Sequence, residues 1–408
     1  RNNPVTSQQL RFTYLNVGHF VDHLFMLIFA KAAFSAGISF GLAEDGAYAE
    51  MIPYGIPSLV LFGAGAPLAA YIADKWNRNS MIMVFFVGIG LSAIATGFAQ
   101  SPLQIAVGLA AIGLFASIYH PVGIAMVVQG GGKIGWRLGL NGVWGNMGVA
   151  AAPLITGFIL ADYDWRAAFM IPGAVAVAFG IGYMMFVRRG GGKPPVHAAG
   201  EKEIVGFMPG WKRALFAISL VTSAGGFVFG TMTFVIPRMF EVSMPDVTVD
   251  VATTGLLAAL VYAIAAFAQM VVGRLIDKYR VKPVLFVIAL AQPILIGIMA
   301  TQMNYALFFA TLLAMAFVFG QIPITDTVIS RYVPDAWRSK VMAVKLMLNL
   351  VIGALSLLAA RYILESGAGF SGVIAVVAIV AALISLAALL LPGRVRREVA
   401  VQTISPAE

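Results

Sequence analysis

The sequence contains no cysteine, and only 11% of its 408 residues are charged. Without cysteine the chain cannot form disulfides, bind zinc through thiolates or use a thiol nucleophile. Soluble domains carry about a quarter charged residues, so this scarcity of charge argues against a soluble protein. The chain also lacks a G-x-x-x-x-G-K-[ST] loop and an H-E-x-x-H motif, which disfavours an ATP-driven pump and an intramembrane enzyme.

Long apolar runs account for the 60% hydrophobic composition and the mean hydropathy of +0.89. A helix needs about 20 apolar residues to cross a bilayer, and an open sheet cannot span lipid. The runs therefore predict an all-α polytopic membrane protein with twelve transmembrane helices. The predicted spans are 12–37, 48–72, 80–99, 103–128, 138–160, 166–187, 212–238, 252–276, 283–301, 305–330, 340–363 and 370–391.

Charge is distributed unevenly over the segments between these spans. Lys and Arg concentrate before the first span and in every second connection, whereas the other connections carry mainly Asp and Glu. Cytoplasmic loops are enriched in Lys and Arg, so we predict that both termini lie on the cytoplasmic side of a bacterial-type inner membrane. Lys31, Arg238 and Arg361 fall near the outer span ends, where long side chains can snorkel, and Glu241 is assigned to an outer loop.

The sequence divides into two halves around a basic segment that is rich in Gly and Pro, which is typical of a flexible linker. Asp74 corresponds to Asp277, and Pro121 to Pro323, at nearly the same offset. Such spacing indicates an internal duplication, a common feature of secondary transporters. The predicted domains are a six-helix bundle at 1–187, the cytoplasmic linker at 188–210, a second six-helix bundle at 211–393 and a cytoplasmic tail at 394–408.

The duplicated segments AYIADKWNR at 70–78 and GRLIDKYR at 273–280 resemble the signature G-x-L-x-D-K/R-x-G-R/K of the major facilitator superfamily. The first copy has Ala70 in place of the leading Gly, and the second has Arg280 at the later Gly position. The resemblance implies two six-helix bundles that alternate access to a central site. It also implies that the signature holds the halves together at the inner face, where an acidic group meets a helix N-terminus. The implied gating residues are Asp74, Lys75, Arg78, Asp277 and Lys278.

Two weaker resemblances point to exporters within that superfamily. The Gly/Pro-rich stretch at 145–157 is similar to a motif of proton-driven exporters, although Ala152 replaces the Gly of its Gly-Pro pair. Small residues there would equally allow close helix packing. The first span around Gly18 and the Tyr-His-Pro element at 119–121 are similar to fosmidomycin-resistance-like exporters.

The first span carries polar groups at bilayer depth. At about 100° per residue, Asn16, His19, Asp22, His23 and Met26 fall on one helix face. Ionisable groups in a membrane normally face the bundle interior or a water-filled cavity. We therefore expect this face to be the working face of the helix.

Other spans contribute fewer candidate site residues. By the family resemblance, the first, fourth, seventh and tenth spans line the central cavity, which brings His120 and Asp326 towards the first span. Lys345 is the expected ion-pair partner of Asp326, either as a structural pair or in gating or coupling. His120 beside Pro121 could instead satisfy a carbonyl freed by the proline. Further substrate-site candidates are Gln321 and Trp144.

These residues allow three chemistries. A buried carboxylate and imidazoles can bind and release protons, so Asp22 with its neighbouring histidines suits proton coupling or solute binding. The same groups could form a hydrogen-bonded structural cluster. Imidazole and carboxylate also suit divalent metals, so His19, Asp22, His23 and His120 are candidate metal ligands.

We expect a non-enzymatic secondary transporter that exports a small organic solute and is driven by protons. Proton-coupled uptake of an organic anion and divalent-metal transport are the alternatives. The expected partners are the lipid bilayer and a small-molecule substrate. We expect no nucleic acid, no cofactor beyond the proton gradient, and a monomer.

Overall fold

The computed structural model describes residues 7–129, 134–192, 206–248 and 250–393, and these residues form helices and no strands. It contains 12 segments long and apolar enough to cross a membrane, which match the predicted spans one to one. The first half comprises α1 (Ser7–Ser39), α2 (Ala47–Met51), η1 (Ile52–Gly55), α3 (Ile56–Lys75), α4 (Arg78–Thr96), α5 (Pro102–Ala116), η2 (Tyr119–Gly123), α6 (Ile124–Val128), α7 (Ile134–Asp162), α8 (Trp165–Phe186) and η3 (Val187–Gly191). The second half comprises α9 (Trp211–Ser243), α10 (Val251–Lys278), α11 (Val281–Met299), α12 (Asn304–Gly320), α13 (Ile322–Tyr332), α14 (Asp335–Glu365) and α15 (Gly369–Leu390). The predicted tail and most of the predicted linker, including His197, lie outside the described residues.

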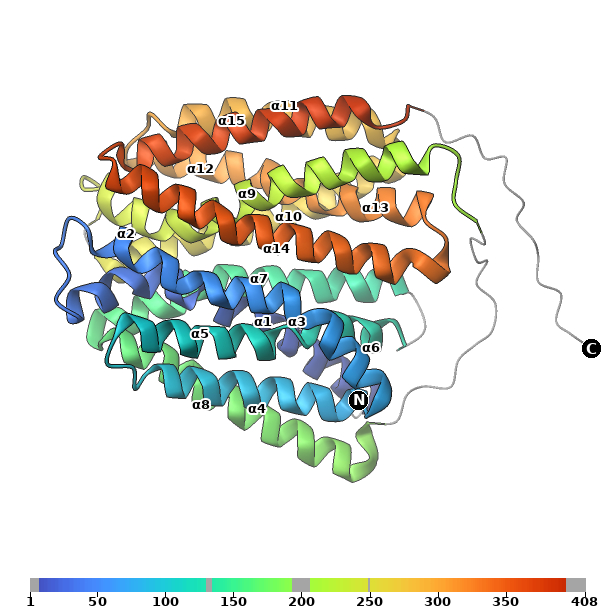
Figure 1. The fold of residues 1–408 in the computed structure, drawn as a ribbon, viewed down its shortest axis with the longest axis horizontal. Helices are drawn as coiled ribbons and strands as arrows, with labels where there is room; N and C mark the ends of the chain where they lie inside the picture. The colour runs from blue at the N-terminus through green and yellow to red at the C-terminus, as the bar shows by residue number, and fades with distance from the viewer. Residues whose placement is uncertain (1–6, 130–133, 193–205, 249, 394–408) are drawn as a thin grey trace, which may run out of the picture.

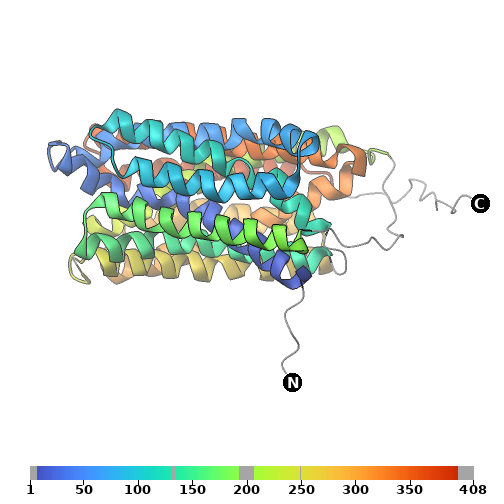
Figure 2. The same ribbon diagram turned by 90° about the horizontal axis from the view of Figure 1, so that it is seen from below.

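The two halves form separate helical bundles that lie side by side (Figures 1 and 2). In the first bundle α1 packs on α7, and α4 packs on both α5 and α8. In the second bundle α9 packs on α14 and α15, and α10 packs on α12. The bundles meet along two helix pairs, α7 with α10 and α3 with α14, and α1 also contacts α9. The interface between the halves is therefore built mainly by α1, α3, α7, α9, α10 and α14.

Local sequence explains where several helices begin and bend. Asn77, Ser101 and Asp250 cap α4, α5 and α10, because each side chain accepts a hydrogen bond from the backbone N–H three residues on. At Asp250 the bonds from the Thr253 hydroxyl and backbone N–H lower the pKa of the carboxyl. The fourth span is interrupted around Pro121, where the backbone forms the π-helical turn η2. This turn is one wall of the site described below.

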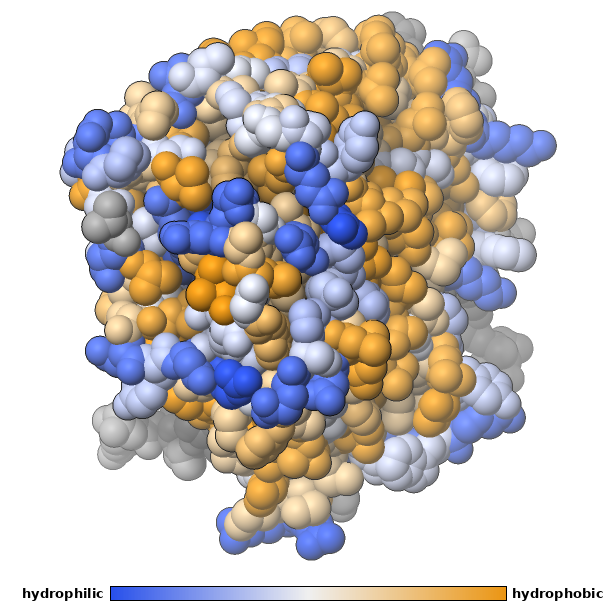
Figure 3. Space-filling model, turned by 60° about the vertical axis from the view of Figure 1, so that its left-hand side comes forward, coloured by the Kyte–Doolittle hydropathy of each residue, from blue (hydrophilic) through white to orange (hydrophobic). Residues whose placement is uncertain are grey.

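The outer surface has the character expected of a protein in lipid. Large apolar side chains face outward along the flanks; Val107 on α5 and Ile379 on α15, for example, are 66% and 68% exposed. Figure 3 shows this broad apolar flank beside an end of the bundle where hydrophilic residues gather. The protein is thus a multi-pass membrane protein. We name the end where α1 and α9 begin the terminal end (right in Figure 1) and the opposite end the distal end.

Buried charges join the halves at the distal end. The Lys31 ammonium on α1 donates to the Glu241 carboxylate on α9, and to the Thr254 hydroxyl on α10 at 2.8 Å. Arg238 donates to the other carboxylate oxygen of Glu241 at 2.7 Å and stacks on Phe34. The expected snorkelling of Lys31 is wrong, because its side chain is 0% exposed. The expected loop position of Glu241 is also wrong, because α9 continues to Ser243.

Small residues bring the halves into backbone contact next to these charges. A Cβ on Gly157 of α7 would lie 2.9 Å from the carbonyl oxygen of Val251 on α10. A Cβ on Gly255 of α10 would overlap the carbonyl oxygen of Pro153. Two glycines therefore permit α7 and α10 to approach each other more closely than larger residues would allow. Nearby, the Tyr48 hydroxyl donates to the Phe234 carbonyl across the same interface at 3.0 Å.

Candidate functional site

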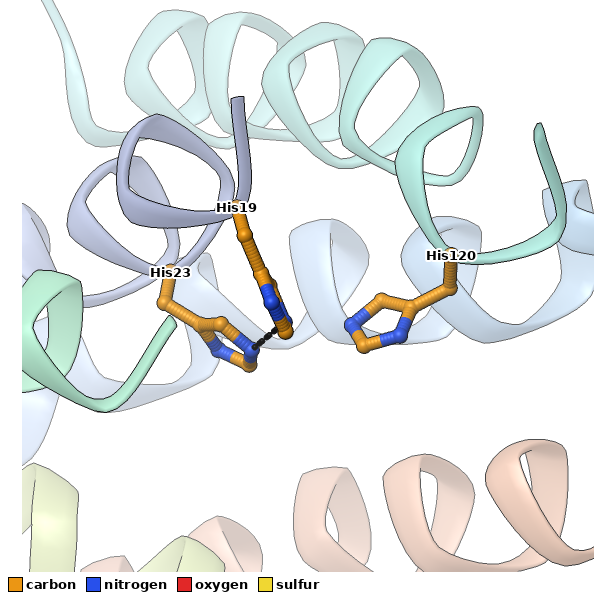
Figure 4. Close-up of side chains that lie close together, drawn as sticks. All are labelled: His19, His23 and His120. Carbon is orange, nitrogen blue, oxygen red and sulfur yellow. Dashed lines mark hydrogen bonds between the residues drawn. The ribbon is translucent and has the colours of Figure 1, made fainter. Parts of the chain in front are cut away.

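Three imidazoles converge near the middle of the first bundle. His19 and His23 project from successive turns of α1, and His120 projects towards them from η2 (Figure 4). One ring nitrogen from each histidine lies within 4.8 Å of those of the other two. The predicted convergence of the first and fourth spans is therefore present in the structure. We refer to His19, His23 and His120 as the histidine cluster.

The hydrogen bonds of His19 define how its ring is oriented. Its Nδ1 lies 2.8 Å from the backbone oxygen of Asn141 and 3.0 Å from the side-chain oxygen of the same residue. Both partners only accept, so Nδ1 carries the hydrogen and Nε2 presents a lone pair. His23 Nε2 lies 3.2 Å from that Nε2, so His23 is the donor in this contact. Asn141 thus fixes which nitrogen of His19 faces the cluster.

Asp22 lies on the other side of His120. Its Oδ2 is 3.4 Å from His120 Nε2, and its side chain is 0% exposed. Among the residues that the structure describes, neither carboxylate oxygen of Asp22 has a hydrogen-bond partner. The His120 side chain is 18% exposed, so the cluster is less completely buried on that side than at Asp22. The predicted group of Asn16, His19, Asp22 and His23 does share one face of α1, with His23 less buried than the rest.

A network of polar side chains holds the cluster from behind. The Asn141 amide donates to the Asn16 side-chain oxygen at 3.0 Å and to the Tyr119 hydroxyl at 2.8 Å. That hydroxyl donates to the Leu15 carbonyl at 2.6 Å, while the Tyr119 ring stacks on His19 with centroids 4.9 Å apart. Sequence analysis missed Asn141, whose place near the start of its span resembles an ordinary interfacial position. Its one available signal was an amide inside a span that is otherwise mostly small and apolar.

Glycines on α7 make room for these side chains. A Cβ on Gly145 would lie 2.6 Å from His19 Nε2, and a Cβ on Gly148 would overlap the backbone oxygen of Phe20. The Gly/Pro-rich stretch at 145–157 therefore contacts α1 at its start and α10 at its end. Close packing, which was one of its two sequence interpretations, accounts for its glycines.

We expect Gly145→Ala to destabilise the protein. His19 is held by Asn141 on one side and by Tyr119 on another, so the ring cannot retreat from the added methyl group. Overpacking of this kind costs about 1–3 kcal/mol. Thermal unfolding of the detergent-solubilised protein measures the effect. Gly142→Ala on the same helix is the control, because nothing lies within 4 Å of its Cβ position; equal stability of the two variants would contradict the prediction.

The second bundle contributes an ion pair to the same level of the protein. The Lys345 ammonium on α14 donates to the Asp326 carboxylate on α13, and these side chains are 17% and 45% exposed. Lys345 also interacts electrostatically with His120 of the first bundle.

Two further predicted site residues lie elsewhere. Gln321 lies inside the second bundle, where Gln292 donates to it at 2.7 Å, and Trp144 packs on Phe20. Neither is placed in the histidine cluster by a contact that the structure describes.

The signature residues lie at the terminal end and make contacts within their own halves. Asp74 pairs with Arg78 one turn further on at 3.3 Å, and both remain partly exposed. Lys75 lies over the Tyr71 ring and Lys278 over the Tyr279 ring. Asp277 is exposed at the end of α10. The hydrogen bonds between the halves that the described residues show are at the distal end, so the halves are closed against each other on the distal side.

Most of the chain is similar in sequence to one large family. The family model described as Major Facilitator Superfamily matches residues 24–245 and 222–406. Among curated proteins, the multidrug resistance protein MdtG of Yersinia enterocolitica is 30% identical over 130 residues, which are 31% of this chain and 31% of that protein. The "Probable sulfoacetate transporter SauU" of Cupriavidus necator is 26% identical over 171 residues, 38% of this chain and 39% of that protein. The chain thus spans about a third of the length of the curated relatives it matches.

Solved structures are similar over nearly the full length. A bacterial homologue of the human lysosomal transporter Spinster, in an inward-facing and unoccupied conformation, matches with a TM-score of 0.70 and 15% identity, covering 95% of each chain. A D-xylose–proton symporter matches with a TM-score of 0.73 and 14% identity, covering 95% of this chain and 98% of that one. At this identity the likeness concerns the fold, and it agrees with the two-bundle architecture.

Proposed function

This chain belongs to the major facilitator superfamily of secondary transporters, and we propose that it exports a small solute in exchange for protons. The observation that carries the proposal is the Asp326–Lys345 ion pair, which lies in membrane-spanning helices and is still partly exposed. Carboxylates inside transmembrane bundles are costly to bury and commonly belong to proton or ion pathways. An acid that loses its lysine partner on protonation would link proton binding to the position of α14.

Proton exchange is better assigned to Asp326 than to Asp22, the leading candidate from the sequence. The Asp326 side chain is 45% exposed, whereas the Asp22 side chain is 0% exposed behind His120. Asp326 is therefore the more accessible of the two acids in this state. Asp22 then belongs with the histidines as a binding group, which is the second role that the sequence allowed it.

Orientation follows from the charges at the two ends. We propose that the terminal end faces the cytoplasm of an inner membrane, since Lys and Arg concentrate there. The state with a closed distal end then accepts its solute from the cytoplasm, as an exporter must at the start of its cycle. The relatives named as drug-resistance proteins support this direction.

The test is transport in proteoliposomes with an imposed pH gradient. Candidate organic anions, cationic drugs and divalent metals are added in turn, and an internal pH-sensitive dye reports proton movement. We expect Asp326→Asn to lower gradient-driven transport at least about a hundredfold, because a proton-pathway carboxylate is lost. Exchange of solute for solute, which moves no protons, should persist in this variant.

The matched control is Glu365→Gln, which removes the acid of another ion pair on α14. Glu365 bonds Arg361 at 2.7 Å near the distal end, and both are partly exposed. This variant should transport like the unmodified protein. Gradient-driven transport that survives Asp326→Asn would reject the assignment of proton coupling to this pair.

The relatives' names favour an organic cargo, which is also the class predicted from the sequence. These relatives match less than two fifths of the chain, and their printed names refer to chemically different compounds. The cargo class therefore has to be sought in the side chains of this chain.

A further inference from the structure

We infer that the histidine cluster binds one divalent transition-metal ion and that this ion is the cargo. The inference rests on the proposed transport function. It assigns a metal cation, instead of an organic solute, as the transported substrate, and it does so from the side chains at the site.

The spacing of the ligand atoms fits a single ion. With metal–nitrogen bonds of about 2.0–2.1 Å, two ligands of a tetrahedral site lie about 3.4 Å apart. The Nε2 atoms of His19 and His23 are 3.2 Å apart, and His120 Nε2 is 3.4 Å from the Asp22 carboxylate. One ring nitrogen from each of the three histidines lies within 4.8 Å of the other two, so side-chain movements of about an ångström would complete the set.

The supporting groups match those around known metal ligands. A metal-binding histidine usually donates its other ring N–H to a carbonyl or carboxylate, which fixes the tautomer and turns a lone pair towards the ion. His19 does this with the Asn141 oxygens at 2.8 and 3.0 Å. In the structure the lone pair of His19 Nε2 accepts a hydrogen from His23 Nε2; for a metal ion to bind both nitrogens, that hydrogen moves to His23 Nδ1 or leaves to water as a proton.

Asp22 supplies the negative charge that an incoming cation needs. Its carboxylate oxygens are buried and unpartnered among the described residues, which is costly for a polar group inside a membrane protein. A cation held beside His120 would satisfy them, either as a fourth ligand or by fixing the His120 ring. Gly145 completes the site, since any larger residue there would fill the position next to His19 Nε2.

The donor set indicates the class of ion. Imidazole nitrogen suits Zn²⁺, Co²⁺, Ni²⁺, Cu²⁺ and Fe²⁺, whereas Mg²⁺ and Ca²⁺ prefer sites built from oxygen alone. A chain without cysteine offers no thiolate for soft ions such as Cu⁺. We therefore assign the site to a late first-row divalent cation.

Binding is tested first, because it does not require transport. The purified full-length protein is titrated with Zn²⁺ by calorimetry and with Co²⁺ by visible absorption, which reports the coordination geometry of the ion. We expect one site per chain, with affinity lowered at least about a hundredfold in His23→Gln and His120→Gln, because losing a ligand should exceed the 10–100-fold effect of losing an outer-shell partner. Mg²⁺ should not compete.

The control is His197→Gln, which removes the remaining histidine of the chain and should leave the affinity unchanged. Folding of every variant is checked by thermal unfolding without metal. Zn²⁺ at a hundred times its dissociation constant should stabilise the unmodified protein by about 2.7 kcal/mol and the ligand variants by no more than about 0.4 kcal/mol.

Transport is the second arm, with Zn²⁺ followed by a fluorescent indicator in proteoliposomes. Zn²⁺ binding that survives in Asp326→Asn while Zn²⁺ movement stops would support both proposals. If the unmodified protein bound neither Zn²⁺ nor Co²⁺, or if the His23 and His120 variants bound them as tightly as the unmodified protein, the metal site would be overturned. Proton-coupled transport would then still stand. Binding without any Zn²⁺ movement, in vesicles that move protons with another solute, would overturn the metal as cargo.

Discussion

Replacing Glu241 with glutamine should release the distal end of the protein. Glu241 is the shared partner of Lys31 and Arg238, and the Lys31 side chain is 0% exposed. Removing one member of a buried ion pair costs about 3–5 kcal/mol, because the remaining charge stays buried without compensation. Separation of the halves at the distal end would remove that cost, because the Lys31 ammonium would then be hydrated. The state closed at this end should therefore lose most of its population.

A single cysteine can report this change, since the chain has none of its own. Ala252 on α10 is 8% exposed and lies against Gly157 of the other half. In an Ala252→Cys background, Glu241→Gln should speed maleimide labelling at least about tenfold, the ratio that 1.4 kcal/mol produces. Lys31→Met should have a smaller effect, because Arg238 still compensates Glu241. Slow labelling in both variants would show that these charges do not hold the distal end.

Gly255→Ala should have the second large effect, in this case by steric conflict. The new methyl group would overlap the Pro153 carbonyl oxygen, and it would also lie 3.3 Å from the Gly157 Cα. Both neighbours are backbone atoms, so α7 and α10 must separate. Overpacking costs about 1–3 kcal/mol, and we expect transport to fall about tenfold as the closed state is lost.

Gly297→Ala on α11 is the control for this variant, because nothing lies within 4 Å of its Cβ position. Transport is measured in proteoliposomes, and stability by thermal unfolding in detergent. If both alanine variants behaved alike, the close approach of α7 and α10 would have no part in holding the halves together.

The fold was readily predicted because lipid imposes one strong rule on the sequence. A span must be long and apolar, so each of the twelve predicted spans corresponds to an observed one with boundaries shifted by a few residues. Errors arose where a charge is neutralised inside the protein. Lys31 was expected to snorkel, and Glu241 to lie in a loop, because hydropathy treats each charge alone. A partner from another helix cannot be read from either residue's own neighbourhood.

The site was predicted in part, for a related reason. Helical spacing was enough to place Asn16, His19 and Asp22 on one face of α1, and the family resemblance brought His120 towards them. Neither could reveal that Asn141 orients His19, since that contact joins positions 122 residues apart. The difference between a proton site and a metal site also depends on distances of about an ångström, which no spacing rule supplies.

The histidine cluster belongs entirely to the first bundle, although the two bundles share a duplicated pattern. At the offset that relates Pro121 to Pro323, His120 corresponds to Ile322, so the second bundle has no imidazole at that position. A ligand held by one bundle keeps its coordinating atoms while the halves rock, and its affinity changes only through what the other bundle presents, above all Lys345. The proton gradient limits how steep a cargo gradient can be sustained, whereas the difference in affinity between the two states sets the cargo concentrations at which the site fills on one side and empties on the other, at tenfold for each 1.4 kcal/mol.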